Sequence, residues 1–161
     1  MSQVTQNRPL SECELGAWRG LLRTHAMLVK RLDAELDAEH GLPLTSYEVL
    51  LHLADAPERK MRMCDVADSV LLSRSGLTRL IDRLERDGFV ERVSCPDDAR
   101  GAYAKLTHYG YAKLEAARST HLEGVREHFL RHFGDEELEV LAEAWMRVTG
   151  VAAAAGPDCD A

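Results

Sequence analysis

The middle of the chain constrains the fold most, because two helical segments joined by a tight turn are followed at once by two strands. Residues 61–70 place apolar side chains at helical spacing, and Ser73 is a suitable N-cap for a second helix that runs to Asp87. Residues 89–94 and 102–106 then have the character of short strands. This order predicts a helix-turn-helix with a β-hairpin behind it.

The hairpin and the long flanking helices complete the predicted architecture. Residues 95–101 are polar and rich in turn formers, which predicts a hairpin tip longer than two residues. Residues 11–38 and 108–133 each follow a helical apolar period. Short signals at helix ends complete the pattern: a capping box of Thr45 and Glu48, a stop at Pro57, an αL position at Gly88, an N-cap at Thr107 and another at Asp135.

The predicted fold is therefore mainly α with a β-hairpin wing, a winged helix-turn-helix flanked by long N- and C-terminal dimerisation helices. The terminal helices have apolar faces that one compact winged helix cannot cover, so we expect a two-fold dimer. The expected division of the chain is an N-terminal dimerisation helix at 1–42, a DNA-binding module at 43–107, C-terminal dimerisation helices at 108–151 and a disordered tail at 152–161.

The outer face of the second helix carries residue types that suit DNA. Arg74 and Arg79 can each donate two hydrogen bonds to a guanine, and shorter side chains beside them allow a close approach. Arg83 and Arg86 are placed for phosphates. Arg100 at the hairpin tip can enter a minor groove, held by Asp98. The predicted DNA-binding residues are Ser73, Arg74, Ser75, Thr78, Arg79, Arg83, Arg86, Asp98 and Arg100.

A structural interpretation of the same residues remains open. The arginines of the second helix could instead pair with Asp82, Glu85 and Asp87 on a solvated helix, and Arg100 could form an ordinary surface ion pair. Charge distribution favours the nucleic-acid interpretation. The chain carries a net charge of −7, yet residues 58–105 hold ten Lys and Arg against nine Asp and Glu. Screening makes this local balance matter more than the total.

Residues 63–92, with the wing segment and the start of the next helix, resemble the MarR family of transcriptional regulators. The wing residues that match the family pattern are Asp98, Arg100, Leu106, Thr107 and Gly110. Ala99 departs from it, because many members carry a second arginine there. The resemblance implies a homodimer with intertwined terminal helices that binds a pseudo-palindromic double-stranded operator as a ligand-responsive repressor. It also implies a small aromatic effector, and Trp18, His25 and Tyr47 could line its pocket.

Other functions find less support in the sequence. The seven histidines form no HExxH or Cys/His cluster, so we expect no metal and no cofactor. Neither a nucleophile–base set nor a glycine-rich phosphate loop is present, so we expect no enzyme. Redox sensing through Cys13, Cys64 or Cys95 stays open, although Glu12 and Glu14 beside Cys13 oppose thiolate formation. A winged helix used only for protein contacts is a further alternative.

The segments that direct a protein to a membrane are not recognisable in this chain. No apolar run approaches the roughly 20 residues that cross a bilayer. The polar first ten residues lack the apolar core of a signal peptide. We therefore expect a cytoplasmic protein without a membrane partner.

Overall fold

The computed structural model describes residues 8–70, 72–95 and 98–150, and for residues 95 and 98–101 it describes the backbone alone. The predicted disordered tail at 152–161 lies outside these residues. The elements in chain order are α1 (Glu12–His40), α2 (Leu44–Asp55), the 3-10 turn η1 (Pro57–Arg59), β1 (Lys60–Arg62), α3 (Met63–Ser69), α4 (Arg74–Arg86), β2 (Val90–Cys95), β3 (Asp98–Leu106), α5 (His108–His128), the 3-10 turn η2 (Leu130–His132) and α6 (Asp135–Thr149).

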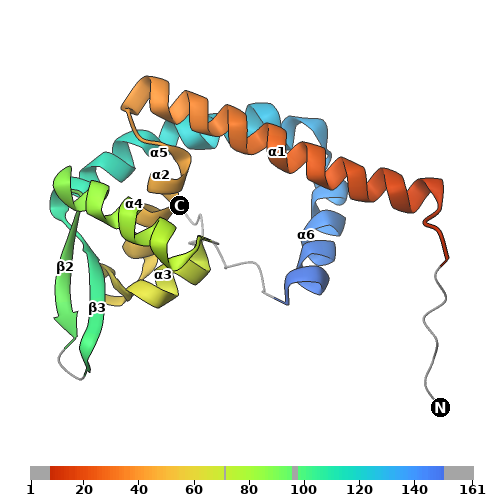
Figure 1. The fold of residues 1–161 in the computed structure, drawn as a ribbon. Helices are drawn as coiled ribbons and strands as arrows, with labels where there is room; N and C mark the ends of the chain where they lie inside the picture. The colour runs from red at the N-terminus through yellow and green to blue at the C-terminus, as the bar shows by residue number, and fades with distance from the viewer. Residues whose placement is uncertain (1–7, 71, 96–97, 151–161) are drawn as a thin grey trace, which may run out of the picture.

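The elements form a winged-helix unit at one end of two long helices (Figure 1). Helix α1 runs along α5, and α2, α3, α4 and the sheet gather beneath the C-terminal end of α1. Helix α6 extends downward at the far end of α5. This architecture confirms the predicted mainly helical fold with a β-hairpin wing.

Local capping explains where several helices begin. Ser73 Oγ accepts from the amide of Gly76 at 3.1 Å, and Thr107 Oγ1 accepts from the amide of Gly110 at 2.9 Å, so both predicted N-caps are confirmed. Gly88 has φ of +78°, the left-handed conformation expected after α4, which glycine adopts without a Cβ clash.

Two other capping predictions are wrong. Helix α2 begins at Leu44 with Pro43 as its N-cap, so Thr45 and Glu48 form no capping box there. Asp33 of α1 accepts from the Leu44 amide at 2.8 Å and supplies that cap from a neighbouring helix. Helix α6 already includes Asp135, and its N-cap is Gly134.

The sheet differs from the sequence prediction at both of its ends. Residues 60–62 form strand β1, which pairs antiparallel with β3 at register Met61 with Ala104, whereas the sequence predicted helix from residue 61. Three residues are too few for an alternating pattern to register as a strand. The predicted long tip is also wrong, because Cys95 pairs with Asp98 across a register irregularity after Ser94. The strand order is β1-β3-β2.

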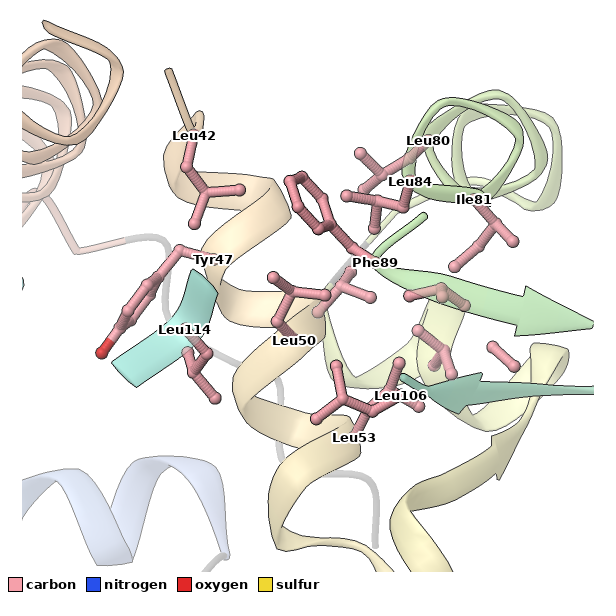
Figure 2. Packing of buried hydrophobic residues seen from close by; sticks show 14 of the residues in the cluster. Leu42, Tyr47, Leu50, Leu53, Leu80, Ile81, Leu84, Phe89, Leu106 and Leu114 are labelled. Atoms are coloured by element: carbon pink, nitrogen blue, oxygen red, sulfur yellow. The ribbon is translucent and has the colours of Figure 1, made fainter. Parts of the chain in front are cut away.

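One hydrophobic core serves the winged-helix unit. Helix α2 lies at its centre and packs against α4, the two long strands and α5 (Figure 2). Leu50 and Leu53 of α2, Ile81 of α4 and Leu114 of α5 have no exposed surface. Burial of such side chains contributes roughly 1.5–3 kcal/mol each, and this core therefore holds α4 in place.

The terminal helices are packed differently. Helix α1 buries Leu32 and Leu36, but towards its N-terminus Trp18 and Leu22 are about half exposed. Helix α6 has no buried residue among its fifteen, and Val140, Trp145 and Val148 all face solvent in the single chain. An amphipathic helix of this kind gains its stability from packing of its apolar face. The single chain leaves that face uncovered.

Candidate DNA-binding surface

Helix α4 directs one face into the core and the other away from the protein. Its buried residues are Leu77, Leu80, Ile81 and Leu84. The exposed residues of the opposite face include those that the sequence predicted for DNA binding, namely Ser73, Arg74, Ser75, Thr78, Arg79, Arg83 and Arg86. The predicted residues of α4 are thus brought together on one exposed surface, which we call the α4 outer face.

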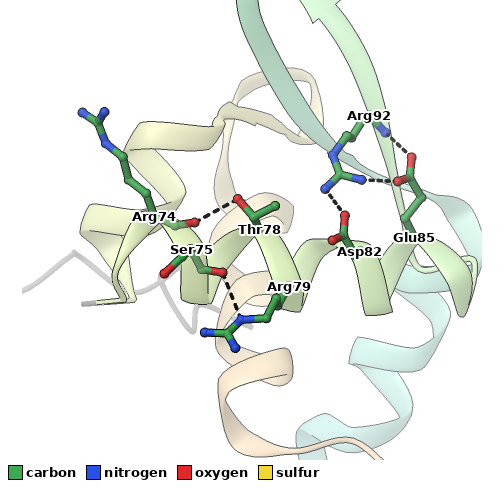
Figure 3. Close-up of polar contacts among 7 residues, drawn as sticks. All are labelled: Arg74, Ser75, Thr78, Arg79, Asp82, Glu85 and Arg92. Carbon is green, nitrogen blue, oxygen red and sulfur yellow. Dashed lines mark hydrogen bonds and ion pairs between the residues drawn. The ribbon is translucent and has the colours of Figure 1, made fainter.

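Local hydrogen bonds arrange the first turns of the α4 outer face (Figure 3). Thr78 Oγ1 donates to the carbonyl of Arg74 at 2.9 Å. Arg79 Nε donates to the carbonyl of Ser75 at 3.4 Å, so the rest of its guanidinium remains directed outward. Arg74 extends away from the helix at its N-terminal end. Both guanidinium groups are therefore available to a ligand approaching this face.

The arginines of α4 do not pair with the carboxylates of their own helix. Within the described part of the chain, no ion pair joins a carboxylate to Arg74, Arg79, Arg83 or Arg86. Arg83 Nη2 instead donates to Ser46 Oγ at 3.2 Å, and Ser46 is buried in α2. This arrangement argues against the alternative in which α4 is a self-paired solvated helix.

The carboxylates of α4 are paired with Arg92 of β2, a residue that the sequence analysis missed. Arg92 Nη2 donates to Asp82 Oδ1 at 2.5 Å, and Arg92 Nη1 donates to Glu85 Oε2. The Arg92 amide also donates to Glu85 Oε1 at 3.2 Å. Partial burial opposes the charged guanidinium, but the hydrogen bonds and charges of Asp82 and Glu85 outweigh it and raise the pKa of Arg92.

The wing is formed by strands β2 and β3, which pair antiparallel. Strands β2 and β3 project beyond the helices as a two-stranded ribbon. The backbone of Asp98 and Arg100 belongs to β3, whereas their side chains lie outside the described part of the structure. The predicted contact between Asp98 and Arg100 therefore remains a prediction.

The three residues predicted to line an effector pocket lie in different environments. Trp18 and His25 are exposed on α1, while Tyr47 is 2% exposed and its ring lies 4.5 Å from that of His121. Burial lowers the pKa of His121, whose Nδ1 is buried without a hydrogen-bond partner among the described residues. Burial raises the pKa of Glu48, and the charges of His52 and His25 oppose that rise. His25 therefore lies close enough to α2 to act on Glu48.

Among the residues that the structure describes, the cysteines and the remaining polar groups define no further centre. Cys13 and Cys64 are exposed free thiols, and Cys64 Sγ donates to Asp65 Oδ1 at 3.5 Å. The side chain of Cys95 is outside the described structure. Over the described ranges, no three His, Cys, Asp or Glu side chains are grouped as they would be around a metal ion. Likewise, none of the helices described is long and apolar enough to span a bilayer.

Comparison with known proteins decides the family. A model described as MarR family matches residues 40–101, which include α2, α3, α4, β2 and the first residues of β3. AbsC, a MarR family transcriptional regulator from Streptomyces coelicolor, superposes with a TM-score of 0.82 and is 32% identical, over 89% of this chain and 97% of that one. The chain belongs to the MarR family.

Two further relatives extend this comparison. Another Streptomyces coelicolor regulator, solved in complex with DNA, superposes with a TM-score of 0.84 at 32% identity, over 93% of this chain and 94% of that one. The HTH-type transcriptional repressor YetL of Bacillus subtilis is 28% identical over 66% of this chain, and the match spans 63% of YetL. These relatives are named as regulators of transcription, and the protein is accordingly described as a MarR family transcriptional regulator.

Proposed function

We propose that this MarR family protein is a ligand-responsive repressor that binds double-stranded DNA of pseudo-palindromic sequence as a homodimer, and that its effector is a small aromatic molecule. The observation that carries the proposal is the α4 outer face, whose arginines form no ion pair with any carboxylate of the described residues and which lies beside a projecting wing. In helix-turn-helix proteins, the second helix enters the major groove with its N-terminal residues at the base edges. Arg74 and Arg79 occupy the corresponding positions of α4.

Each side chain of the α4 outer face then has a defined role. Arg79 and Arg74 reach base edges, since a guanidinium can donate two hydrogen bonds to guanine O6 and N7. Ser73, Ser75 and Thr78 contact the backbone or a base at close range. Arg86, near the C-terminal end of α4, binds a phosphate together with Arg83. The wing places Arg100 in the adjacent minor groove, with Asp98 orienting it.

Dimerisation is the role that we assign to the terminal helices. Residues 1–42 and 108–151 would pair with the same segments of a second copy, and residues 43–107 would form the DNA-binding module. The support is the set of exposed apolar side chains on α1 and α6, including Trp18, Leu22, Trp145 and Val148. Within each helix these side chains lie three or four residues apart, and an exposed apolar helix face of this kind marks an interaction site. A two-fold dimer presents two copies of α4 to the two half-sites.

For the ligand we propose a site where α1 approaches α2, near Trp18, His25 and Tyr47. An exposed indole and a histidine that acts on Glu48 offer stacking and hydrogen bonding to a small aromatic molecule. Titration with simple phenols and aromatic carboxylates should change tryptophan fluorescence, and Trp18→Phe should remove that change. A response carried entirely by Trp145 would place the ligand elsewhere.

Selection of bound duplexes from a random library tests the proposed DNA binding. We expect enrichment of sequences with two inverted half-sites, recovered by the dimer. Neutralisation of six to ten phosphates predicts a loss of ~10³–10⁵ in affinity between 50 and 200 mM salt. Failure to enrich any sequence, together with a flat salt dependence, would contradict DNA binding through the α4 outer face.

A further inference from the structure

The α4 outer face contains a carboxylate in the middle of its cationic residues. Ser75, Arg79, Asp82 and Arg86 follow one another at spacings of four, three and four, so they lie along the same side of the helix. Asp82 therefore stands between two arginines that are assigned to DNA. Glu85 follows Asp82 by three residues and extends the acidic region toward the wing.

These two carboxylates would oppose DNA binding if they were uncompensated. Both side chains are partly exposed, at 49% for Asp82 and 41% for Glu85. A phosphate backbone that contacts Arg79 and Arg86 passes close to the carboxylate between them. Like charges placed opposite one another weaken association and reduce its rate.

Arg92 compensates both carboxylates at once. Its guanidinium lies between Asp82 and Glu85 and donates to each of them (Figure 3). The Arg92 side chain is 30% exposed, less than either carboxylate, so it is partly enclosed by the groups that it neutralises. The hydrogen bond from the Arg92 amide to Glu85 also attaches strand β2 directly to α4.

We propose that Arg92 is a positioning residue for DNA binding. It neutralises the acidic side chains of α4 and thereby removes their repulsion of the phosphate backbone. The proposal rests on the proposed function, since it assigns α4 to DNA. Arg92 itself need not touch the nucleic acid, because its effect passes through Asp82 and Glu85. Its role is electrostatic and does not depend on base sequence, so a duplex of random sequence is a sufficient probe.

The sheet offers a matched control for this role. Glu91 precedes Arg92 on β2 and points to the opposite face, where it pairs with Lys105 at 3.1 Å. Arg92→Gln with Asp82→Asn keeps the net charge of the parent and removes one of the two carboxylates, the one that lies between Arg79 and Arg86. Arg92→Gln with Glu91→Gln has that same net charge and leaves Asp82 and Glu85 uncompensated.

The experiment measures the affinity of these dimeric variants for a labelled duplex of random sequence at low and at moderate salt. Arg92→Gln should lose about 10-fold or more at low salt, and the loss should shrink as salt screens the repulsion. Adding Asp82→Asn should restore most of the affinity, whereas adding Glu91→Gln should not. Arg92→Lys should stay near the parent, because it keeps the charge.

Each other outcome overturns the proposal. Equal rescue by Asp82→Asn and Glu91→Gln would show an effect of net charge alone, and a salt-independent loss that Arg92→Lys shares would show a structural role. If Arg92→Gln does not fold, the single variant Asp82→Asn tests the proposal instead. Because Arg92 already neutralises Asp82, the affinity of Asp82→Asn for the duplex should match that of Glu91→Gln. A clearly higher affinity of Asp82→Asn would contradict neutralisation by Arg92. A parent protein that binds no duplex would instead contradict the proposed function itself.

Discussion

The winged-helix unit and the terminal helices α1 and α6 differ in how far they bury their apolar side chains within one chain. Helix α2 buries six of its twelve residues and α4 buries four of thirteen, all within one chain. Helix α6 buries none of its fifteen, and α1 buries two of twenty-nine. The apolar side chains of the winged-helix unit are thus covered within a single chain, whereas α6 and the N-terminal part of α1 leave theirs exposed.

The largest expected effect comes from placing a charge on the uncovered face of α6. Trp145→Asp, combined with Leu22→Asp on α1, should prevent pairing, because a carboxylate cannot be buried there without a partner. The monomer should lose ~10²–10⁴ in affinity for a two-half-site duplex, since the second contact is no longer intramolecular. Light scattering and gel shift measure mass and affinity.

Trp145→Phe is the control for that pair of charges, because it keeps an apolar ring and should remain dimeric. A charged variant that keeps both its dimeric mass and its affinity would show that α1 and α6 do not form the dimer interface. The dimer surface would then lie outside α1 and α6.

Truncation in the core of the winged-helix unit should have the next largest effect. Leu50 of α2 has no exposed surface, so Leu50→Ala should lower the free energy of unfolding by about 2–5 kcal/mol. Val148→Ala on α6 removes a side chain that is 75% exposed in the single chain. In a variant kept monomeric, it should change the same quantity by less than about 0.5 kcal/mol. Urea denaturation of both variants tests this, and similar losses would refute the contrast in packing.

Substitutions on the α4 outer face and on the wing should affect recognition without disturbing the hydrophobic core. Arg79→Ala should cost about 1–3 kcal/mol of binding free energy on the selected duplex and much less on random DNA.

Arg100→Ala should weaken binding most at sites with A·T-rich flanks and leave the preference for the central half-site sequence unchanged. Competition gel shifts measure both. Arg23→Ala, which removes a cation from α1, should leave the ratio of specific to random affinity unchanged, and a change there would undermine the assignment to α4.

The smallest expected effect is a pH dependence at the contact between α2 and α5. Burial lowers the pKa of His121 from its usual 6.5, so the unfolded chain binds the proton more tightly. Stability is then fully present above about 6.5 and is lost as the pH falls toward the lower folded-state value. His121→Phe keeps a ring against Tyr47 and should reduce this slope in urea denaturation between pH 7 and about 5.5. An unchanged slope would assign the acid sensitivity to other groups.

Periodicity and capping chemistry were sufficient to predict most of the fold. The stripe of Leu77, Leu80, Ile81 and Leu84 located α4, and the hydroxyls of Ser73 and Thr107 marked two helix starts correctly. Two of the failures share one cause, which is dependence on a partner in another element. Strand β1 exists because β3 pairs with it, and α2 begins where Asp33 of α1 accepts its amide. Neither partner is near in sequence.

In the candidate site too, the features set by local sequence were predicted and those that depend on packing between elements were not. The exposed cations of α4 follow directly from its apolar stripe, so the sequence analysis identified them. Arg92 was missed because its importance depends on the packing of β2 beside α4, which brings it to Asp82 and Glu85. A strand arginine within ten residues of two helix carboxylates was the available signal. Arg83 was assigned to phosphates, yet its bond to Ser46 also ties α4 to α2.

The junction between the wing and α5 has a mechanical consequence. Thr107 Oγ1 donates to the carbonyl of Gly88 at 2.7 Å and accepts from Gly110, and a Cβ on Gly110 would lie 2.0 Å from the carbonyl oxygen of Phe89. The Thr107 hydroxyl and the close approach at Gly110 thus connect the end of α4, the base of the wing and the first turn of α5. In the proposed dimer, a bend of α5 would therefore displace α4 along the DNA axis. The long helices would then set the distance between the two copies of α4, and with it the spacing of the two half-sites that the dimer can bind.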